Sequence, residues 1–262
     1  MKSKVKNPTD YLTKLQLSPF AQDVLEGLRS QPKRLSSKYF YDDDGSRIFQ
    51  EIMEMPEYYL TNAEFEILQQ QAAALHEALA FGESYSIIEL GAGDGSKTKQ
   101  LLSYLLSQNI KVTYRPLDIS GEAVKILHRD LQKNLPTLEV QPLVGDYFKV
   151  LNQLQRDEQP VLFLFLGSNI GNYEKIEAIQ LLKMFGQHMR KGDKLLVGFD
   201  LKKNPWRILH AYNDAQGITR RFNLNLLVRM NRELGANFKP DQFEFYPTYD
   251  PKKGDVRSYI VS

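Results

Sequence analysis

The residues most able to do chemistry form a glycine-rich segment, Glu89–Thr98 (ELGAGDGSKT). A phosphate-binding P-loop needs a glycine directly before its Lys-Thr pair, and Ser96 stands at that position. The dinucleotide fingerprint G-x-G-x-x-G fails at its third glycine for the same reason, and the acidic residues of the segment would place negative charge beside any phosphate. What remains is G-x-G-x-G, beginning with Gly91 and Gly93, after an acidic residue. This pattern suits a ligand that has amino and hydroxyl groups and no phosphate.

S-adenosylmethionine is such a ligand, and later residues complete a site for it. Lys97, or a helix N-terminus, can hold its carboxylate. Asp118 ends a predicted strand, where it can accept hydrogen bonds from both ribose hydroxyls. Asp146 and Tyr147 follow the next strand, where the acid can accept from the adenine amino group and the ring can flank the purine. Each feature alone has an ordinary explanation as a turn or a helix cap. Together, at the ends of three successive strands, they predict a class I methyltransferase core.

Strand-like and helix-like segments alternate through the middle of the chain, as the hydrophobic periodicity shows. The predicted strands are Ser84–Leu90, Val112–Leu117, Val140–Val144, Val161–Leu166 and Lys194–Phe199. The predicted helices are Thr61–Leu79 with Asn62 as its cap, Ser96–Ser107, a helix capped by Ser120 that runs to about Asn134, and Tyr173–Met189. Continuous apolar strands that alternate with helices indicate an α/β fold, with a parallel sheet of the Rossmann-like methyltransferase type covered by helices on both faces.

The alternation stops after Asp200, which divides the chain into a core and its flanks. We expect residues 62–201 to form the S-adenosylmethionine-binding core, and residues 1–61 and 202–262 to form a second, α+β lobe that binds the substrate. The elements predicted after Asp200 are helices over Pro205–Tyr212 and Ile218–Leu234, the second closed by Gly235, and strands over Phe243–Tyr249 and Asp255–Val261.

Composition and charge exclude several classes of function. The 34 Lys and Arg residues against 32 Asp and Glu leave a net charge of +2, which argues against electrostatically driven nucleic-acid binding. The absence of cysteine excludes disulfides, thiolate metal sites and a cysteine nucleophile, and the four histidines lack metal-ligand spacing, so no metal is expected. The longest apolar run, Val161–Leu166, is far shorter than the roughly 20 residues of a membrane helix. We therefore expect a cytoplasmic monomer with no membrane or nucleic-acid partner.

Six stretches of the sequence together resemble the histidine Nα-methyltransferase family of ergothioneine biosynthesis, which also contains fungal methyltransferases of tryptophan-derived amines. They are Lys38–Ser46 (KYFYDDDGS), Pro56–Thr61 (PEYYLT), Glu89–Thr98, Phe165–Asn172 (FLGSNIGN), Ala211–Thr219 (AYNDAQGIT) and Phe222–Phe238 (FNLNLLVRMNRELGANF). The resemblance runs from about residue 33 to the end of the chain. It implies a two-lobe enzyme that transfers methyl groups from S-adenosylmethionine to the α-amine of an amino acid.

The resemblance also implies roles for individual residues. The cofactor contacts would be Gly91, Lys97, Asp118, Asp146 and Tyr147, and the second glycine of the loop, Gly93, belongs with them. The substrate site would be lined by Tyr58, Gly167, Asn172, Tyr212 and Thr219, with Tyr41 near the reacting amine.

Asn172 and Tyr41 are the candidate catalytic residues. The Asn172 amide can accept a hydrogen bond from the amine and donate one to the substrate carboxylate, which fixes the direction of the nucleophile. Its spacing alone favours a turn and the cap of the following helix, and the FLGSNIGN match reverses that preference in favour of the catalytic role. Tyrosine faces can hold the trimethylammonium group of a fully methylated product.

The expected partner is a small-molecule substrate, histidine, which would be methylated successively to its trimethyl betaine. The alternatives are the same chemistry on another amine, such as a tryptophan derivative, and a cofactor-binding protein without catalysis. Ser258 stands where the family has a methionine that reads the imidazole, which leaves the choice of amine open. Because nothing after the predicted fifth strand supplies the closing hairpin of such a sheet, we also expect the sequence to lack its last core strands.

Overall fold

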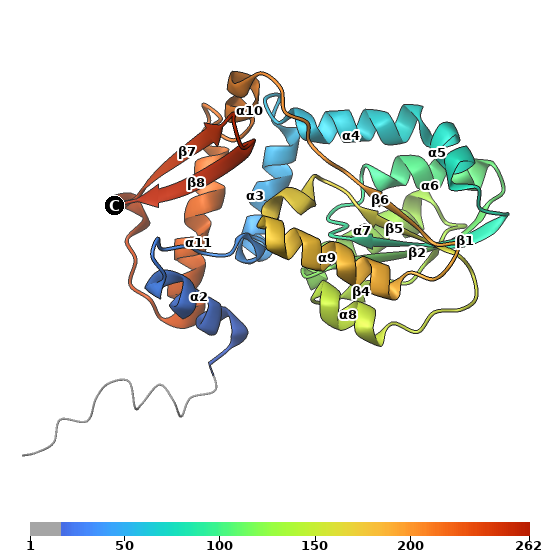
Figure 1. The fold of residues 1–262 in the computed structure, drawn as a ribbon, viewed down its shortest axis with the longest axis horizontal. Coiled ribbons are helices and arrows are strands. Elements are labelled where there is room, and N and C mark those ends of the chain that lie inside the picture. Colours follow the sequence, from blue (N-terminus) through green and yellow to red (C-terminus); the bar gives the residue numbers. More distant parts are fainter. Residues whose placement is uncertain (1–16) are drawn as a thin grey trace, which may run out of the picture.

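The computed structural model describes residues 17–262, which gather around two β-sheets (Figure 1). The larger sheet and its helices lie at the right of the view, and a two-stranded sheet with helices from both ends of the chain lies at the left. The stretch that follows the larger sheet runs back over it to the second group of elements.

The larger sheet is parallel, and its strand order places the predicted ligand residues at one edge. Its strands are β1 (Ser84–Leu90), β2 (Lys111–Asp118), β3 (Glu139–Val140), β4 (Leu143–Val144), β5 (Val161–Phe165) and β6 (Lys194–Val197). The order is β3-β2-β1-β5-β6, with β4 also pairing with β2. Successive strands are added on one side of β1 up to β4 and on its other side from β5 onward. The gap between β1 and β5 is therefore the topological switch point, where open α/β sheets bind ligands. The predicted Rossmann-like α/β fold is confirmed.

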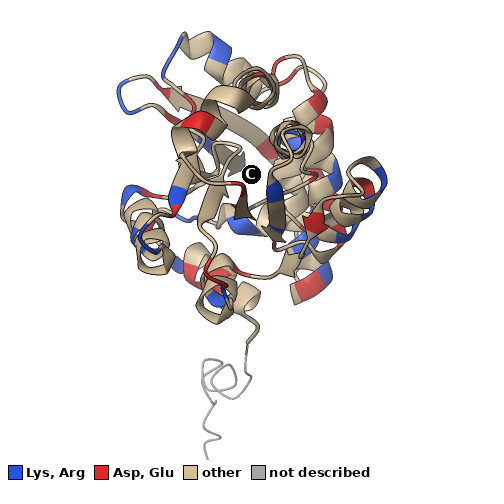
Figure 2. Cartoon of the chain, turned by 90° about the vertical axis from the view of Figure 1, so that its right-hand side faces the viewer, with Lys and Arg blue, Asp and Glu red and all other residues tan. Residues whose placement is uncertain are grey.

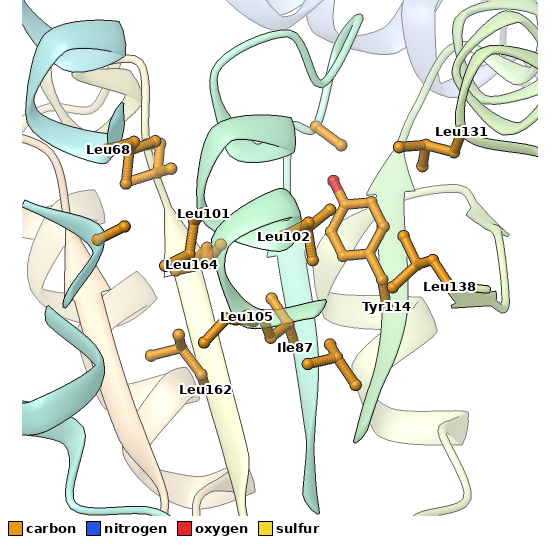
Figure 3. Packing of buried hydrophobic residues seen from close by; sticks show 14 of the residues in the cluster. Leu68, Ile87, Leu101, Leu102, Leu105, Tyr114, Leu131, Leu138, Leu162 and Leu164 are labelled. Carbon is orange, nitrogen blue, oxygen red and sulfur yellow. The ribbon is translucent and has the colours of Figure 1, made fainter. Parts of the chain in front are cut away.

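Helices cover both faces of this sheet, as predicted. One face is covered by α4 (Tyr59–Gln70), α5 (Ala72–Leu79), α6 (Thr98–Ser107) and α7 (Gly121–Asn134), and the other by α8 (Tyr147–Gln153) and α9 (Lys175–His188). Figure 3 shows the first interface, where Leu101, Leu102 and Leu105 of α6 lie against Ile87 and its neighbours on the strands. These leucines recur at helical spacing, so α6 buries one apolar stripe against the β-branched and aromatic residues of the sheet.

Two of the predicted core elements differ from the structure. The predicted strand Val140–Val144 is two short strands, because Pro142 between them has no N–H to donate to a ladder. The predicted helix Thr61–Leu79 is interrupted at Gln71, so that α4 and α5 both pack on the sheet. Asn62 does not cap it, because α4 begins at Tyr59 and Asn62 lies inside its first turn.

The remaining predictions for the core hold within two residues. Ser120 caps α7, accepting a hydrogen bond from Ala123 N at 3.2 Å. Helix α9 begins at Lys175 with Glu174 as its cap, so Asn172 does not cap it. The sequence did not predict α8, which begins directly at Tyr147 with Asp146 as its cap.

The second group of elements joins the two ends of the described chain. Strands β7 (Glu244–Asp250) and β8 (Asp255–Val261) pair antiparallel, and helices α10 (Pro205–Ala211) and α11 (Ile218–Leu234) precede them. Gly235 closes α11 with a φ of 66°, as predicted. Helices α2 (Pro19–Arg29) and α3 (Asp43–Glu54), which the sequence did not predict, complete this group. Phe20 and Tyr39 pack in one cluster with Leu226 and Met230 of α11.

Basic and acidic residues alternate over the face shown in Figure 2, and neither sign gathers there. Between residues 17 and 262, no helix combines the length and apolar character that a membrane span would require.

Candidate functional site

A cavity of about 470 Å³ lies at the carboxyl ends of the parallel strands. Among the predicted cofactor residues, its lining includes Gly91, Gly93, Lys97, Asp118 and Tyr147. Among the predicted substrate residues, it includes Tyr41, Tyr58 and Gly167. Helices α3 and α4 close the cavity from the side of the second group of elements, since Phe49, Met53 and Leu60 line it too.

The glycine loop takes a backbone conformation that other residues rarely adopt. Gly91, Gly93 and Gly95 have φ values of 71°, 56° and 63°. At Gly91 the close approach of another side chain adds to this requirement, because a Cβ there would lie 2.7 Å from the Tyr147 hydroxyl oxygen. The N–H of Gly91 donates to Leu117 O at 2.8 Å, which ties the loop to the end of β2.

Asp118 is fixed at the end of β2 by backbone donors. Its Oδ2 accepts from Gly93 N at 3.1 Å and its Oδ1 accepts from Ser120 N at 2.9 Å. Burial raises the pKa of Asp118, and these backbone hydrogen bonds oppose that rise. Each carboxylate oxygen can accept a second hydrogen bond, so the side chain faces the cavity with acceptor capacity for two hydroxyl donors.

Asp146 and Tyr147 follow β4 but face different surroundings. Tyr147 lines the cavity, and burial raises its pKa. Asp146 is exposed and caps α8, accepting from Lys149 N at 3.2 Å, and it does not line the cavity. The structure therefore brings the aromatic ring to the site and leaves the acid at its margin.

Lys97 and Gly167 both contact Glu64, a cavity residue that the sequence analysis missed. Lys97 Nζ forms an ion pair with Glu64 Oε2, and Gly167 N donates to Glu64 at 2.7 and 2.9 Å. Glu64 lies four residues from both Leu60 and Leu68, which are buried on the same face of α4. A carboxylate at this i, i+4 position of an apolar stripe is the signal that could have identified it.

Glu89, the acidic residue before the glycine loop, also lines the cavity. Its side chain accepts from Thr98 Oγ1 at 2.8 Å and from the Tyr114 hydroxyl. Burial raises the pKa of Glu89 to about 7, although both hydrogen bonds favour the ionised form.

The raised pKa of Glu89 predicts a pH-dependent contribution to stability. The folded protein binds this proton more tightly than the unfolded chain, so stability falls as pH rises from about 4.5 to about 7 and is level above that range. Relative to Glu89→Gln, the parent protein should lose up to about 3 kcal/mol of unfolding free energy between pH 5 and pH 8. Urea unfolding of both proteins across this range measures the difference, and parallel pH profiles would contradict the assignment.

Aromatic side chains form the wall of the cavity on the side of α3. The Tyr41 ring contacts Phe49 edge-on at 5.3 Å between centroids, and Tyr58 contacts Tyr212 in the same way at 5.9 Å. Burial raises the pKa of Tyr41 and Tyr58, and raises that of Tyr212 to about 12. All three side chains are therefore neutral phenols at neutral pH, which donate and accept hydrogen bonds but supply no phenolate base.

Three predicted substrate residues do not line the cavity. Tyr212 reaches it only through the ring of Tyr58. Thr219 is buried in α11, where its N–H donates to Asp214 Oδ1 at 2.8 Å. Asn172 ends the short helix η2 (Asn169–Asn172) and is exposed, whereas Asn169, at the start of η2, lines the cavity beside Gly91.

Comparisons with known proteins identify a family and several relatives of this chain. A family model described as a histidine-specific, SAM-dependent methyltransferase matches residues 20–262. The histidine N-alpha-methyltransferase of Mycobacterium tuberculosis is 37% identical over 239 residues, which cover 91% of this chain and 73% of that protein. The protein of the same name from Mycolicibacterium smegmatis is 35% identical with the same coverage. Ergothioneine biosynthesis protein 1 of Schizosaccharomyces pombe is 29% identical over 90% of this chain and 32% of that protein.

Proposed function

The chain belongs to the family of histidine-specific, S-adenosylmethionine-dependent methyltransferases, and we propose that it methylates the α-amine of histidine successively to the trimethyl betaine. It is an S-adenosylmethionine-dependent N-methyltransferase. The observation that carries the choice of substrate is the similarity to two histidine N-alpha-methyltransferases over nine-tenths of the chain.

The residues of the cavity fit the cofactor. Gly91 leaves the loop open beside Tyr147, and Asp118 offers free acceptor capacity at the end of β2. We propose that Asp118 holds the ribose and that Tyr147 flanks the adenine, with Asp146 at the edge of the adenine ring. We propose that Gly91, Gly93 and Lys97 bind the methionine part of the cofactor. When bound, S-adenosylmethionine supplies a methyl group on a sulfonium, which an amine lone pair takes up as the carbon–sulfur bond breaks.

The chain's own contribution is to present a neutral, oriented amine. A free α-amine has a pKa near 8, so part of it is protonated at neutral pH. The cavity wall of Phe49, Met53 and Leu60 disfavours the charged form, because burial lowers the pKa of an amine. We propose that the neutral Tyr41 hydroxyl accepts a hydrogen bond from the amine and passes a proton toward water.

The aromatic wall also suits a product that gains permanent charge. A trimethylammonium group can no longer donate hydrogen bonds, but it is attracted by the faces of aromatic rings. Tyr41 and Tyr58 line the cavity, and Tyr212 backs Tyr58. We propose that these rings hold the methylated amine, with Gly167, Asn172 and Thr219 on the side of the substrate carboxylate.

The proposal extends to the organisation of the protein. We propose that residues 62–201 bind the cofactor and that the flanking segments form one lobe for the substrate, supported by the packing of Phe20 and Tyr39 on α11. The flanking segments were predicted as 1–61 and 202–262, and residues 1–16 of the first lie outside the described part of the chain. We further propose that the enzyme works as a monomer in the cytoplasm, which its cysteine-free composition permits.

Calorimetry followed by a methylation assay tests the proposed function. We expect S-adenosylhomocysteine to bind, and histidine to gain methyl groups, up to three, when it is incubated with S-adenosylmethionine and analysed by mass spectrometry. Tryptophan, tryptamine and the other amino acids serve as the comparison panel. Faster methylation of a tryptophan derivative than of histidine would show that the tryptophan derivative is the substrate. Cofactor binding without methylation of any amine would contradict a catalytic role.

A further inference from the structure

In the part of the chain that the structure describes, five carboxylates line the cavity, and Glu64 differs from the other four in its hydrogen-bond partners. Each of the other four accepts a hydrogen bond from at least one donor that has no predicted contact with a ligand. The donors are Thr98 and Tyr114 for Glu89, Ser96 for Asp94, Ser120 for Asp118, and Tyr59 for Asp200. Among residues 17–262, Glu64 instead accepts only from Lys97 Nζ and Gly167 N–H. Both of these partners face the cavity and are themselves predicted ligand contacts.

The surroundings of Glu64 are shaped to hold its carboxylate in place. Its side chain is 14% exposed and that of Lys97 is 16% exposed, so the ion pair is largely removed from water. Gly198, directly after β6, has no side chain, and a Cβ there would collide with Glu64 Oε1. The carboxylate thus lies where the segments after β1, β5 and β6 converge on α4.

The order of the strands places this ion pair at one particular end of the bound cofactor. In the sheet, β4 pairs with β2, β2 with β1, and β1 with β5. If the adenine lies beside Tyr147 after β4 and the ribose lies on Asp118 at the end of β2, the other end of the molecule extends over β1 toward β5. Gly167 follows β5, and Lys97 follows the glycine loop of β1, so the Lys97–Glu64 pair lies at the amino-acid end.

We propose that Glu64 binds the α-ammonium of the methionine moiety of the cofactor while Lys97 binds its carboxylate. This inference rests on the proposed function and assigns Glu64 as a cofactor-binding residue. The Lys97–Glu64 ion pair has one positive and one negative charge and no net charge, as a zwitterionic amino acid does. Each charge of the pair can therefore meet the opposite charge of the ligand. A ligand that has the carboxylate but lacks the ammonium would instead leave Glu64 unpaired next to a second negative charge.

Glu64→Gln tests this pairing with two ligands of known chemistry. Glutamine keeps the shape of the side chain and can still accept from Gly167 N–H, but it lacks the charge. The ligands are S-adenosylhomocysteine and its deaminated analogue, which keeps the carboxylate and lacks the ammonium. The parent protein should prefer S-adenosylhomocysteine, and Glu64→Gln should reduce that preference by about tenfold or more, the usual effect of losing a hydrogen bond to a charged group. Glu66→Gln, an exposed change on the same helix, should leave it unaltered.

The ratio of the two dissociation constants separates binding from a structural role. If Glu64 only supports the fold or shields Lys97, both ligands change affinity together, the preference stays as in the parent protein, and the proposal is overturned. A raised KM for histidine with an unchanged preference would also overturn it, because the carboxylate would then serve the substrate. If the parent protein shows the predicted pattern but methylates no amine, only the proposed function fails. Absence of any S-adenosylhomocysteine binding would overturn both.

Discussion

Replacing Asp118 by alanine should weaken S-adenosylhomocysteine binding by about 1–3 kcal/mol, the cost of leaving polar groups without a partner. Two losses combine in this variant. The ribose hydroxyls lose their proposed acceptor, and Gly93 N–H and Ser120 N–H lose the carboxylate that now accepts from them. The second loss loosens the glycine loop, which the Gly93 hydrogen bond ties to β2. Isothermal titration calorimetry measures the dissociation constant directly.

Two further variants identify the source of the Asp118 effect. Asp118→Asn retains an acceptor oxygen for one backbone N–H but turns an amide donor toward the other, so we expect an intermediate loss of affinity. Asp241→Ala, an exposed change in the short helix η3 (Pro240–Gln242), should bind like the parent protein. An unchanged dissociation constant for Asp118→Ala would show that the ribose is bound elsewhere.

The core of the fold could be predicted from the sequence because its signals are local. The continuous apolar run of β5 predicts a fully buried strand, and Ser120 directly before an amphipathic stretch predicts the start of α7. Helices α2 and α3 were not predicted, although Ser18 and Asp42 directly before them are local capping signals. The partner of their apolar residues, α11, lies about two hundred residues later in the chain, so the packing itself could not be predicted from local signals.

The candidate site was predictable to the extent that it depends on strand ends. Gly91, Asp118 and Tyr147 each lie at or within three residues of the end of a strand, and parallel strands bring their carboxyl ends to the same edge. Glu64 lies on a helix before the first strand of the sheet, and its proximity to Gly167 depends on how α4 packs. Asp146 had the right position in the sequence, but the onset of α8 at Tyr147 makes it a cap at the margin of the cavity.

Asn172 and Asn169 lie at opposite ends of η2, and the proposed mechanism needs to distinguish them. The resemblance to the family assigns substrate orientation to Asn172, which is exposed. The structure brings Asn169 to the cavity, where its Nδ2 lies 3.0 Å from the position that a Cβ on Gly91 would take. The segment between them is held by Ile170, which is 9% exposed, and by the Gly171 N–H bond to Ser168 O at 2.9 Å.

Asn172→Ala should lower the rate of histidine methylation by about 100-fold, because misplacing the nucleophile by about an ångström has an effect of that order. Its affinity for S-adenosylhomocysteine should change by less than about twofold, and its thermal stability should match that of the parent, since an exposed side chain leaves no buried group unpaired when it is removed. Asn169→Ala should show the opposite division, with weakened cofactor binding because its amide lies against the glycine loop. Methylation rates at saturating cofactor, measured beside calorimetry, distinguish the two residues. Equal falls in rate and affinity for Asn172→Ala would make its role structural. If only Asn169→Ala lost rate at saturating cofactor, the residue that orients the substrate would be Asn169 and not Asn172.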